Sequence, residues 1–261
     1  MFQRAAMVGF SSLALVACSS GSTAGGIDAP TSSDAGTACE TNPYGECYPS
    51  TDLGTNKADF GASSGARRAA GSTMRNMKWY GYRAGSFARD VANPDAPLKL
   101  VSLAELYDPK GTLGYKVIHL VASSRWCSAC NQETKQFLVP NAADDKAKGI
   151  VVLQTMNDGL RQGNPATAKD IEGWALSTGI FVPNTSNAGT VSTEGTMLFH
   201  LVLDANNANL GPFFDAAAVP WNGWLDARTM EIIDYDLGFD STGSADAKAL
   251  KYVTVNPPKG Q

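Results

Sequence analysis

Two short apolar runs in the middle of the chain predict buried β-strands. They span residues 116–121 and 150–156, and both are rich in β-branched side chains. The stretch between them, residues 128–148, is rich in helix formers and is followed by Gly149, a residue type that commonly ends helices. The pattern predicts a βαβ unit. Pro140 should break or kink its helix, because proline lacks a backbone N–H.

The pattern after this unit predicts one more helix and further strands. The Asn164–Pro165 pair favours a helix start, and Gly179 stands where that helix should end. The apolar positions at helical spacing between them are Ile171, Trp174, Ala175 and Thr178. A polar loop over residues 183–196 then leads to an apolar run over residues 197–204. Upstream of the βαβ unit, aromatic residues at positions 79, 80 and 82 indicate an early strand.

The N-terminus carries a different apolar pattern. Arg4 precedes a run from Ala5 to Ala17 that contains no charged residue. This run is too short for a permanent membrane span and fits the apolar part of a signal peptide. Residues 1–17 are therefore predicted to be a signal peptide that directs export.

The signal ends in Leu-Val-Ala-Cys, which resembles the lipobox of bacterial lipoproteins. The resemblance implies that Cys18 is lipidated and anchors the chain to the inner or outer membrane, facing the periplasm. A plain secretory signal with a chance cysteine is the alternative. Residues 18–38 are mostly small and polar, which predicts a flexible tether. We expect an N-terminal extension over residues 39–75 and the main domain over residues 76–261.

Composition adds two expectations. Without Arg4, 20 basic and 25 acidic residues remain, and no basic cluster of the kind that binds nucleic acid is present. No second long apolar run follows the signal, so the mature chain should be soluble apart from its anchor.

Four cysteines remain if Cys18 carries lipid, and they form two local pairs. Cys39 and Cys47 flank an Asn-Pro-Tyr-Gly turn, so the simplest interpretation is a structural disulfide, which an exported chain permits. A second redox pair that passes electrons to Cys127 is the alternative. The ligand spacing does not fit a zinc site, and the chain's two histidines form no cluster, so no metal is expected.

The second pair, Cys127 and Cys130, lies where the first predicted strand gives way to a helix. Unpaired N–H groups and the helix dipole at a helix N-terminus stabilise a thiolate, which is the nucleophilic form of cysteine. Cys127 should therefore attack a disulfide. Cys130, one turn into the helix, can resolve the mixed disulfide that results.

The sequence Trp126-Cys127-Ser128-Ala129-Cys130 resembles the active site of the thioredoxin superfamily. Glu133, three residues later, is similar to an acidic residue often found in the exported, membrane-tethered TlpA-like subgroup. The resemblance implies an α/β thioredoxin-like fold, with a central mixed β-sheet flanked by helices. It also implies an insertion between the CxxC βαβ unit and a later hairpin.

That hairpin is expected near the end of the chain. Val219–Pro220 resembles the family's cis-proline pair, and Asp226 is similar to the Asp that ends the following strand. Residues 224–225 and 230–233 would then form an antiparallel hairpin. The resemblance implies that a substrate peptide lies along Val219–Pro220.

The implied function is a membrane-anchored, extracytoplasmic thiol–disulfide oxidoreductase that reduces protein disulfides. The redox group would be the Cys127–Cys130 pair itself, without another cofactor. Because the periplasm is oxidising, a reductant there needs an electron source, which we expect to be a membrane thiol transporter.

Several neighbouring residues have two interpretations. Trp126 either shields the thiol and guides substrate or simply packs. Glu133 is either a proton shuttle or a first-turn acid that complements the helix dipole. Where thioredoxin has a buried Asp before the first cysteine, this chain has Val121, which makes Glu133 the candidate for proton transfer. His119 and His200 are interpreted as core or edge histidines.

Other functions remain open. The bulky Trp221 follows the cis-proline pair and could block the groove, which suggests a redox-inert binding or structural lipoprotein. A metal-delivery module that uses the CxxC pair is a further alternative. Asp144 and Asp145 are interpreted as a solvated face.

The residues around Cys127 predict the direction of electron flow. Ser128 and Ala129 carry no charge, Arg125 is expected to reach solvent, and the anion of Glu133 would disfavour a thiolate. A weakly stabilised thiolate predicts a reductant, with a potential of roughly −220 mV or lower. A disulfide-donating oxidant is the alternative.

Overall fold

The computed structural model describes residues 39–49, 73–184, 186–187, 190–211, 218–239 and 241–257. The predicted signal peptide, Cys18 and the predicted tether lie outside these residues. The chain from Cys39 onward forms one compact unit.

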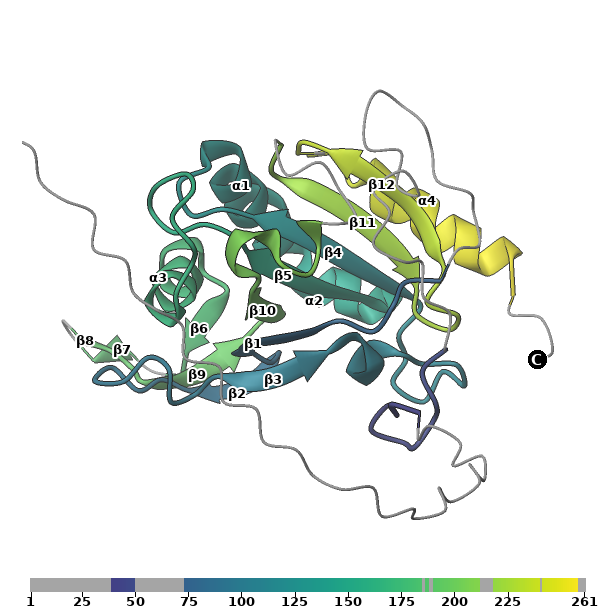
Figure 1. The fold of residues 1–261 in the computed structure, drawn as a ribbon, viewed down its shortest axis with the longest axis horizontal. Coiled ribbons are helices and arrows are strands. Elements are labelled where there is room, and N and C mark those ends of the chain that lie inside the picture. Colours follow the sequence, from purple (N-terminus) through teal and green to yellow (C-terminus); the bar gives the residue numbers. More distant parts are fainter. Residues whose placement is uncertain are drawn as a thin grey trace, which may run out of the picture. The chain divides into compact units, whose positions relative to one another are not determined.

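A seven-stranded mixed sheet forms the centre of this unit, in the order β12-β11-β4-β5-β10-β1-β3 (Figure 1). Its strands are β1 (Lys78–Tyr82), β3 (Lys99–Ser102), β4 (Val117–Ser123), β5 (Ile150–Met156), β10 (His200–Leu203), β11 (Trp221–Asp226) and β12 (Ile232–Leu237). Strands β4, β5 and β10 run parallel to one another, and the other neighbours pair antiparallel. This is the expected α/β fold, and the early strand, the βαβ pair and the late hairpin are confirmed.

Helices cover the sheet. Helix α1 (Ser128–Glu133) is joined by a π-helical segment (Thr134–Leu138) to α2 (Val139–Lys148), and the later helices are α3 (Ala168–Thr178) and α4 (Ser244–Val255). Two short 3-10 helices span Leu103–Leu106 and Ala205–Asn207. Helix α2 packs on β5, α3 on β6 and β10, and α4 on β4, β11 and β12 (Figure 1).

The helix does not break at Pro140. Instead the turn before it widens, and the Val139 N–H donates to the Thr134 carbonyl five residues back. A normal α-helical turn would require an N–H at Pro140 and would press its ring against a preceding carbonyl. The wider π turn avoids both, and the helix then ends at Gly149 with φ 88°, as expected.

The predicted start of α3 is wrong. Pro165 forms an isolated β-bridge with Asp158, and the helix begins three residues later, after Thr167. Thr167 and Asp170 form a capping pair, in which Asp170 Oδ2 accepts the Thr167 backbone N–H at 3.0 Å and the Thr167 hydroxyl at 2.7 Å. The Asp170 side chain thus pairs a backbone donor at the helix start, whereas Pro165 is held in the bridge to Asp158.

The apolar run over residues 197–204 is divided between two strands. β9 (Glu194–Met197) lies between β2 (Gly85–Ala88) and β6 (Phe181–Pro183) in a separate three-stranded sheet, whereas β10 joins the central sheet. A two-stranded ribbon of β7 (Ser186–Asn187) and β8 (Thr190–Val191) lies nearby in sequence. The expected insertion between the βαβ unit and the late hairpin therefore contains α3, β6, β7, β8 and β9, and β9 also pairs with β2 from the earlier part of the chain.

The core has two main clusters, one on each face of the sheet. Along β4, Ile118 and Leu120 belong to the first cluster, with Trp79 and Trp221. Val121 points the other way and belongs to the second cluster, which also contains the two CxxC cysteines and Trp174 of α3. The alternation of a β-strand thus separates the two cores.

The segment over residues 39–49 shares the first core. Cys39 and Cys47 form a disulfide with Cα atoms 5.4 Å apart. Tyr48 is buried in the first cluster, and its hydroxyl donates to the Met74 carbonyl at 2.7 Å. The Asn42 side chain donates to the Tyr107 carbonyl at 2.8 Å. The loop is therefore attached to the sheet face opposite the CxxC pair.

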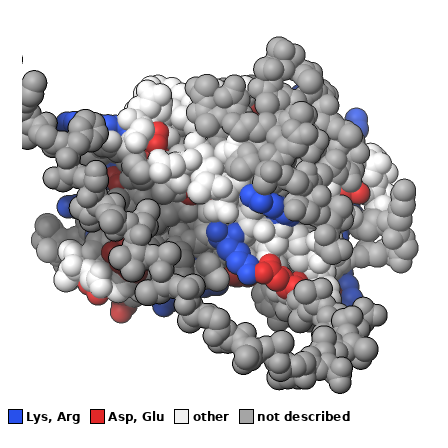
Figure 2. Space-filling view, viewed as in Figure 1, with Lys and Arg blue, Asp and Glu red and all other residues white. Residues whose placement is uncertain are grey.

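The described residues on one face carry charges of both signs. Figure 2 shows basic and acidic side chains scattered over this face among uncharged ones. No helix within the described ranges is long and apolar enough to cross a membrane.

Candidate active site

Cys127 lies at the N-cap of α1, directly after β4. Its Sγ accepts the Cys130 backbone N–H at 3.1 Å, and its carbonyl accepts the Asn131 N–H. Cys127 and Cys130 form a disulfide with Cα atoms 5.3 Å apart. Cys127 is 5% exposed and Cys130 is fully buried. The more exposed of the two cysteines is thus also the one whose sulfur receives a helix N–H.

The cis-proline loop faces this sulfur. The Val219–Pro220 bond is cis, and Cys127 Sγ lies 3.5 Å from the Val219 carbonyl oxygen. Strand register explains the contact: Trp221, the first residue of β11, pairs with Ala122 near the end of β4. The end of β4 therefore lies beside the start of β11. As a result, Cys127, which follows β4, meets Val219–Pro220, which precedes β11.

Trp221 does not block the groove. Its side chain is 1% exposed and belongs to the core cluster on the other face of the sheet. It covers the α-carbon of Gly223, where a β-carbon would collide with the indole, and it stacks on Tyr235 with ring centroids 6.4 Å apart. The expectation that Trp221 could close the site is wrong, because side chains alternate along β11 and this one points away from Cys127.

Trp126 is held beside the site by an acidic residue. Its indole N–H donates to Asp158 Oδ2 at 2.8 Å, while 38% of the residue remains exposed. The Asp158 carbonyl also accepts the Arg125 backbone N–H. The exposed, fixed indole can contact a substrate next to Cys127.

Arg125 does not extend freely into solvent as expected. Its guanidinium pairs with Asp170 of α3 at 2.8 Å and lies against Gly173. Partial burial raises the pKa of Asp170, but hydrogen bonds from Thr167 and Arg125 outweigh it, so the pKa is lowered overall. The positive charge of Arg125 is thus matched by a carboxylate.

Glu133 is buried near the cysteines on the inner face of α1. It is 2% exposed, and its Oε1 accepts a hydrogen bond from Asn222 Nδ2 at 2.8 Å. Burial raises the pKa of Glu133 to about 8, the Asn222 hydrogen bond opposes this rise, and repulsion by Asp246 adds to it. A buried acid with this pKa differs from a surface acid that complements a helix dipole.

His119 and Asp246 extend the polar site beyond Glu133. His119 is buried in β4, its Nε2 lies 2.7 Å from Asn222 Oδ1, and its ring stacks on Trp224. Its Nδ1 lies 3.3 Å from Asp246 Oδ1, which accepts the Trp224 indole N–H at 2.6 Å. His119 is therefore a core histidine, as predicted, within a polar network that also contains Glu133.

Asp145 is not part of a solvated face. Asp145 is a buried residue of α2 that lines a cavity beside α4. Its neighbour Asp144 is exposed and pairs with Lys148 at 2.6 Å. Burial, followed by repulsion from Asp246, raises the pKa of Asp145 to about 6. The sequence alone could not place Asp145, because the cavity that it lines is shared with α4, about 100 residues later.

His200 is also buried, at the start of β10. Burial lowers the pKa of its imidazole to about 4, so it is neutral at physiological pH. In the described ranges, no group of three or more His, Cys, Asp or Glu residues is placed to hold a metal ion.

Three residues of the site were missed in the sequence: Asn222, Asp246 and Asp158. Asn222 stands two residues after Pro220 and points toward the helices because Trp221 points away. Because adjacent strand residues face opposite sides, the sequence could have indicated that Asn222 and Trp221 point in opposite directions. No sequence pattern indicated Asp246 or Asp158, since their roles depend on contacts across the fold.

Comparisons with known proteins found similar solved structures but no matching family. No family model matches it, and no curated protein matches it. The thioredoxin domain of a thiol–disulfide oxidoreductase from Bacteroides vulgatus is 16% identical, with a TM-score of 0.42; the match covers 70% of this chain and 98% of that one. AhpC from Enterococcus faecalis is 15% identical, with a TM-score of 0.46 and coverage of 74% and 98%.

StoA from Bacillus subtilis is 14% identical, with a TM-score of 0.39 and coverage of 64% and 96%. The chain's own topology is thioredoxin-like: a mixed sheet, a CxxC pair at the start of a helix that follows a central strand, and a cis-proline before the neighbouring antiparallel strand.

The raised pKa of Glu133 predicts a pH-dependent stability. The folded protein binds this proton more tightly than the unfolded chain, whose Glu pKa is near 4.5, so the stabilisation is complete below that pH and is lost as pH rises through about 8. As pH rises from about 4.5 to about 8, the free energy of unfolding of wild type should fall by roughly 2–5 kcal/mol relative to that of Glu133→Gln. Each tenfold difference in proton affinity between folded and unfolded protein contributes about 1.4 kcal/mol. Chemical denaturation of the oxidised proteins at several pH values measures it.

The exposed Glu194 provides the control, since Glu194→Gln should give no such pH-dependent difference from wild type. A constant difference between wild type and Glu133→Gln from pH 4 to pH 9 would show that Glu133 titrates normally.

Proposed function

We propose that this protein is an extracytoplasmic thiol–disulfide oxidoreductase that reduces disulfides in protein substrates. The observation that carries the proposal is the position of Cys127 Sγ, which receives a helix N–H and lies 3.5 Å from the Val219 carbonyl beside the cis-proline. This arrangement supports a stabilised thiolate next to backbone that can hold an extended peptide.

In the first step, the Cys127 thiolate attacks one sulfur of a substrate disulfide. A bond forms between Cys127 and that sulfur, the substrate S–S bond breaks, and the second substrate sulfur leaves as a thiolate. The exposed indole of Trp126 and the backbone at Val219–Pro220 position the substrate.

In the second step, Cys130 loses its proton to the Glu133 carboxylate and attacks Cys127 Sγ. The Cys127–Cys130 disulfide forms, and the first substrate sulfur leaves as a thiolate. Two electrons have passed from the enzyme dithiol to the substrate, and both substrate thiolates take protons from water. A dithiol reductant, which we propose is a membrane thiol donor, regenerates the enzyme.

Glu133 suits the proton transfer in the second step. It stands three residues after Cys130 on the same buried face of the helix, where i and i+3 side chains are neighbours. Its pKa of about 8 is close to the ordinary pKa of a thiol, about 8.5, so a proton moves between the two groups at little cost.

The charges around Cys127 support a reductant rather than an oxidant. Ser128 and Ala129 are neutral, and the Arg125 charge is matched by Asp170 at 2.8 Å. With these neighbours neutral or paired, we propose that the thiolate is stabilised mainly by the helix N-terminus, and that the disulfide is correspondingly harder to reduce.

We further propose that Cys18 carries lipid and anchors the protein to a membrane, with the segment before Cys39 as tether. The uncharged run over residues 5–17, and the Leu-Val-Ala sequence before Cys18, support this. The Cys127–Cys130 pair would then act at the periplasmic side of the membrane as the protein's own redox group.

The activity is tested by insulin reduction with dithiothreitol, using full-length protein in detergent. Wild type should accelerate the reduction, and Cys127→Ser should lower the rate at least 100-fold because the nucleophile is lost. The Cys39→Ser/Cys47→Ser double variant is the control. It should retain turnover while its unfolding free energy falls by about 2.6 kcal/mol, the loop-closure value for nine residues. Loss of turnover at unchanged stability in this variant would favour a relay between the two pairs.

The direction of electron flow is tested by equilibration with glutathione buffers, followed by alkylation and mass analysis. The potential of the Cys127–Cys130 pair should be roughly −220 mV or lower, because Ser128 and Ala129 are neutral and Arg125 is paired with Asp170. A value above about −150 mV would instead identify a disulfide donor.

The anchor is tested by cell fractionation of Cys18→Ser. The variant should leave the membrane fraction or accumulate as an unprocessed precursor, because no acyl chain can be attached. Normal cleavage together with normal membrane retention contradicts the lipoprotein proposal.

A further inference from the structure

Glu133 lines a small cavity. Its volume of about 10 Å³ is close to the space of one water molecule. Glu133, His119, Asn222 and Asp246 contribute to its lining. These residues come from four elements: α1, β4, β11 and α4.

Three buried polar atoms at this cavity have no hydrogen-bond partner among the described residues. They are Glu133 Oε2, His119 Nδ1 and Asp246 Oδ2. His119 Nδ1 lies 3.3 Å from Asp246 Oδ1, but this contact lacks hydrogen-bond geometry. Buried polar groups are nearly always paired with protein or ordered water, and a buried water typically makes about three hydrogen bonds. Three unpaired atoms on residues that line the same cavity match that requirement.

Asp246 also lines a second and larger cavity of 260 Å³, between α2 and α4. Asp145 and Lys148 contribute to its wall, and Lys148 is largely exposed at the surface. Asp145 Oδ2 is a further buried atom without a partner in the described ranges. Carboxyl groups thus lead from the small cavity at Glu133 toward the surface beside α2.

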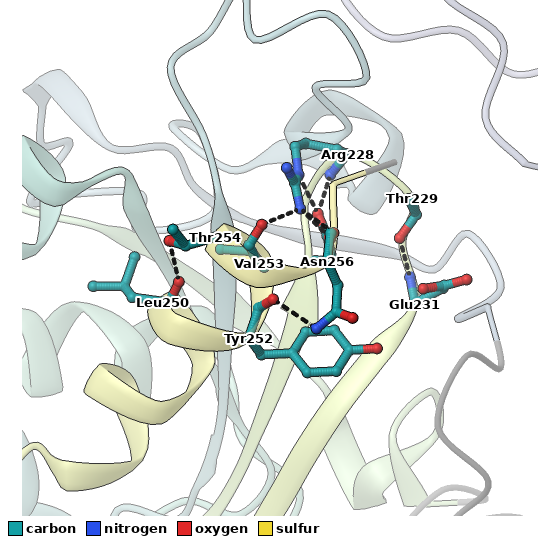
Figure 3. A network of polar contacts seen from close by, with 9 residues as sticks. Arg228, Thr229, Glu231, Leu250, Tyr252, Val253, Thr254 and Asn256 are labelled. Carbon is teal, nitrogen blue, oxygen red and sulfur yellow. Dashed lines mark hydrogen bonds and ion pairs between the residues drawn. The ribbon is translucent and has the colours of Figure 1, made fainter. Parts of the chain in front are cut away.

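Helix α4 holds Asp246 in place through contacts at both ends. Near its start, Asp246 accepts the Trp224 indole N–H at 2.6 Å. At its end, Arg228 donates to the carbonyls of Val253 and Asn256 at 2.8 and 3.2 Å, as Figure 3 shows. Arg228 is itself fixed by Asp226, the last residue of β11, at 2.7 Å. Strand β11 therefore sets the position of both Asn222 and Asp246 relative to Glu133.

We propose that one water molecule occupies the small cavity, and that it and Asp246 carry protons between Glu133 and the larger cavity beside Asp145. In this path Asp246 acts on the cysteines only through Glu133. The inference rests on the proposed role of Glu133 as the group that takes the Cys130 proton. After each resolving step, Glu133 returns that proton through the water and Asp246 to solvent, and the carboxylate is restored.

The titratable groups that face this site come from every element packed against Glu133. They are His119 of β4, Asp145 and Lys148 of α2, Asp236 of β12 and Asp246 of α4, besides the two cysteines. The Asp246 carboxylate raises the pKa of Glu133, whereas Asn222 lowers it. Removing the charge of Asp246 should therefore lower the pKa of Glu133.

Asp246→Asn tests this with little disturbance of the fold, because the Asn oxygen can still accept the Trp224 indole N–H. The Glu133 carboxyl is titrated by carbon-13 NMR in the oxidised, full-length protein, with Glu133→Gln to assign its signal. The proton affinity of Glu133 should fall at least threefold in Asp246→Asn. The control Asp144→Asn, at an exposed position of α2, should leave it unchanged. An unchanged Glu133 titration in Asp246→Asn overturns the inference.

A second readout separates proton movement from a purely structural role. Reduced enzyme is mixed with an aromatic disulfide that releases one coloured thiolate on attack by Cys127 and another on resolution by Cys130. In Asp246→Asn, the pH at which the second phase reaches half its limiting rate should shift down with the pKa of Glu133, while the first phase stays unchanged. If only the NMR titration shifts, the proton path is wrong.

A high-resolution crystal structure tests the water directly, and a dry cavity would overturn its part in the path. Failure of this inference can be distinguished from failure of the proposed function. An inactive wild type in the insulin assay removes the role of the cysteines, whereas the coupling of Asp246 to Glu133 is measured without turnover.

Discussion

The antiparallel pairing of β11 with β4 is the constraint on which the site depends. It places Trp221 opposite Ala122, and so brings the loop before β11 against the helix that follows β4. The same register decides which side chains of β11 face the helices. Asn222 points toward Glu133, while Trp221 enters the opposite core. A shift by one residue would reverse both orientations and would place the indole at the dithiol.

The buried acid near the cysteines reduces stability at neutral and higher pH. Removing a carboxylate from water is costly, and here the Asn222 amide offsets part of the cost while the nearby Asp246 adds to it. Such arrangements are concentrated at functional sites, where a pKa near that of the reacting group is needed. The same burial that disfavours the Glu133 anion brings its pKa close to that of a thiol.

Helix α4 connects this acid to the rest of the molecule. It packs on β4, β11 and β12, and Arg228 joins its C-terminal carbonyls to Asp226 at the end of β11 (Figure 3). A helix that would otherwise only cover the sheet thus contributes a carboxylate to the wall of the Glu133 cavity. The polar network crosses four elements, and its geometry depends on all of their contacts.

The sequence alone determined the local features of this protein. Periodicity and turn residues predicted the βαβ unit, and the CxxC pair with Val219–Pro220 predicted the two halves of the site, because these signals arise from neighbouring residues. Only the tertiary structure decided that Trp221 points away from Cys127 and that Asp145 is buried. It also showed that Asp246 of α4 lies beside Glu133. Burial and pKa depend on what packs against a residue from distant segments, and no local pattern records that.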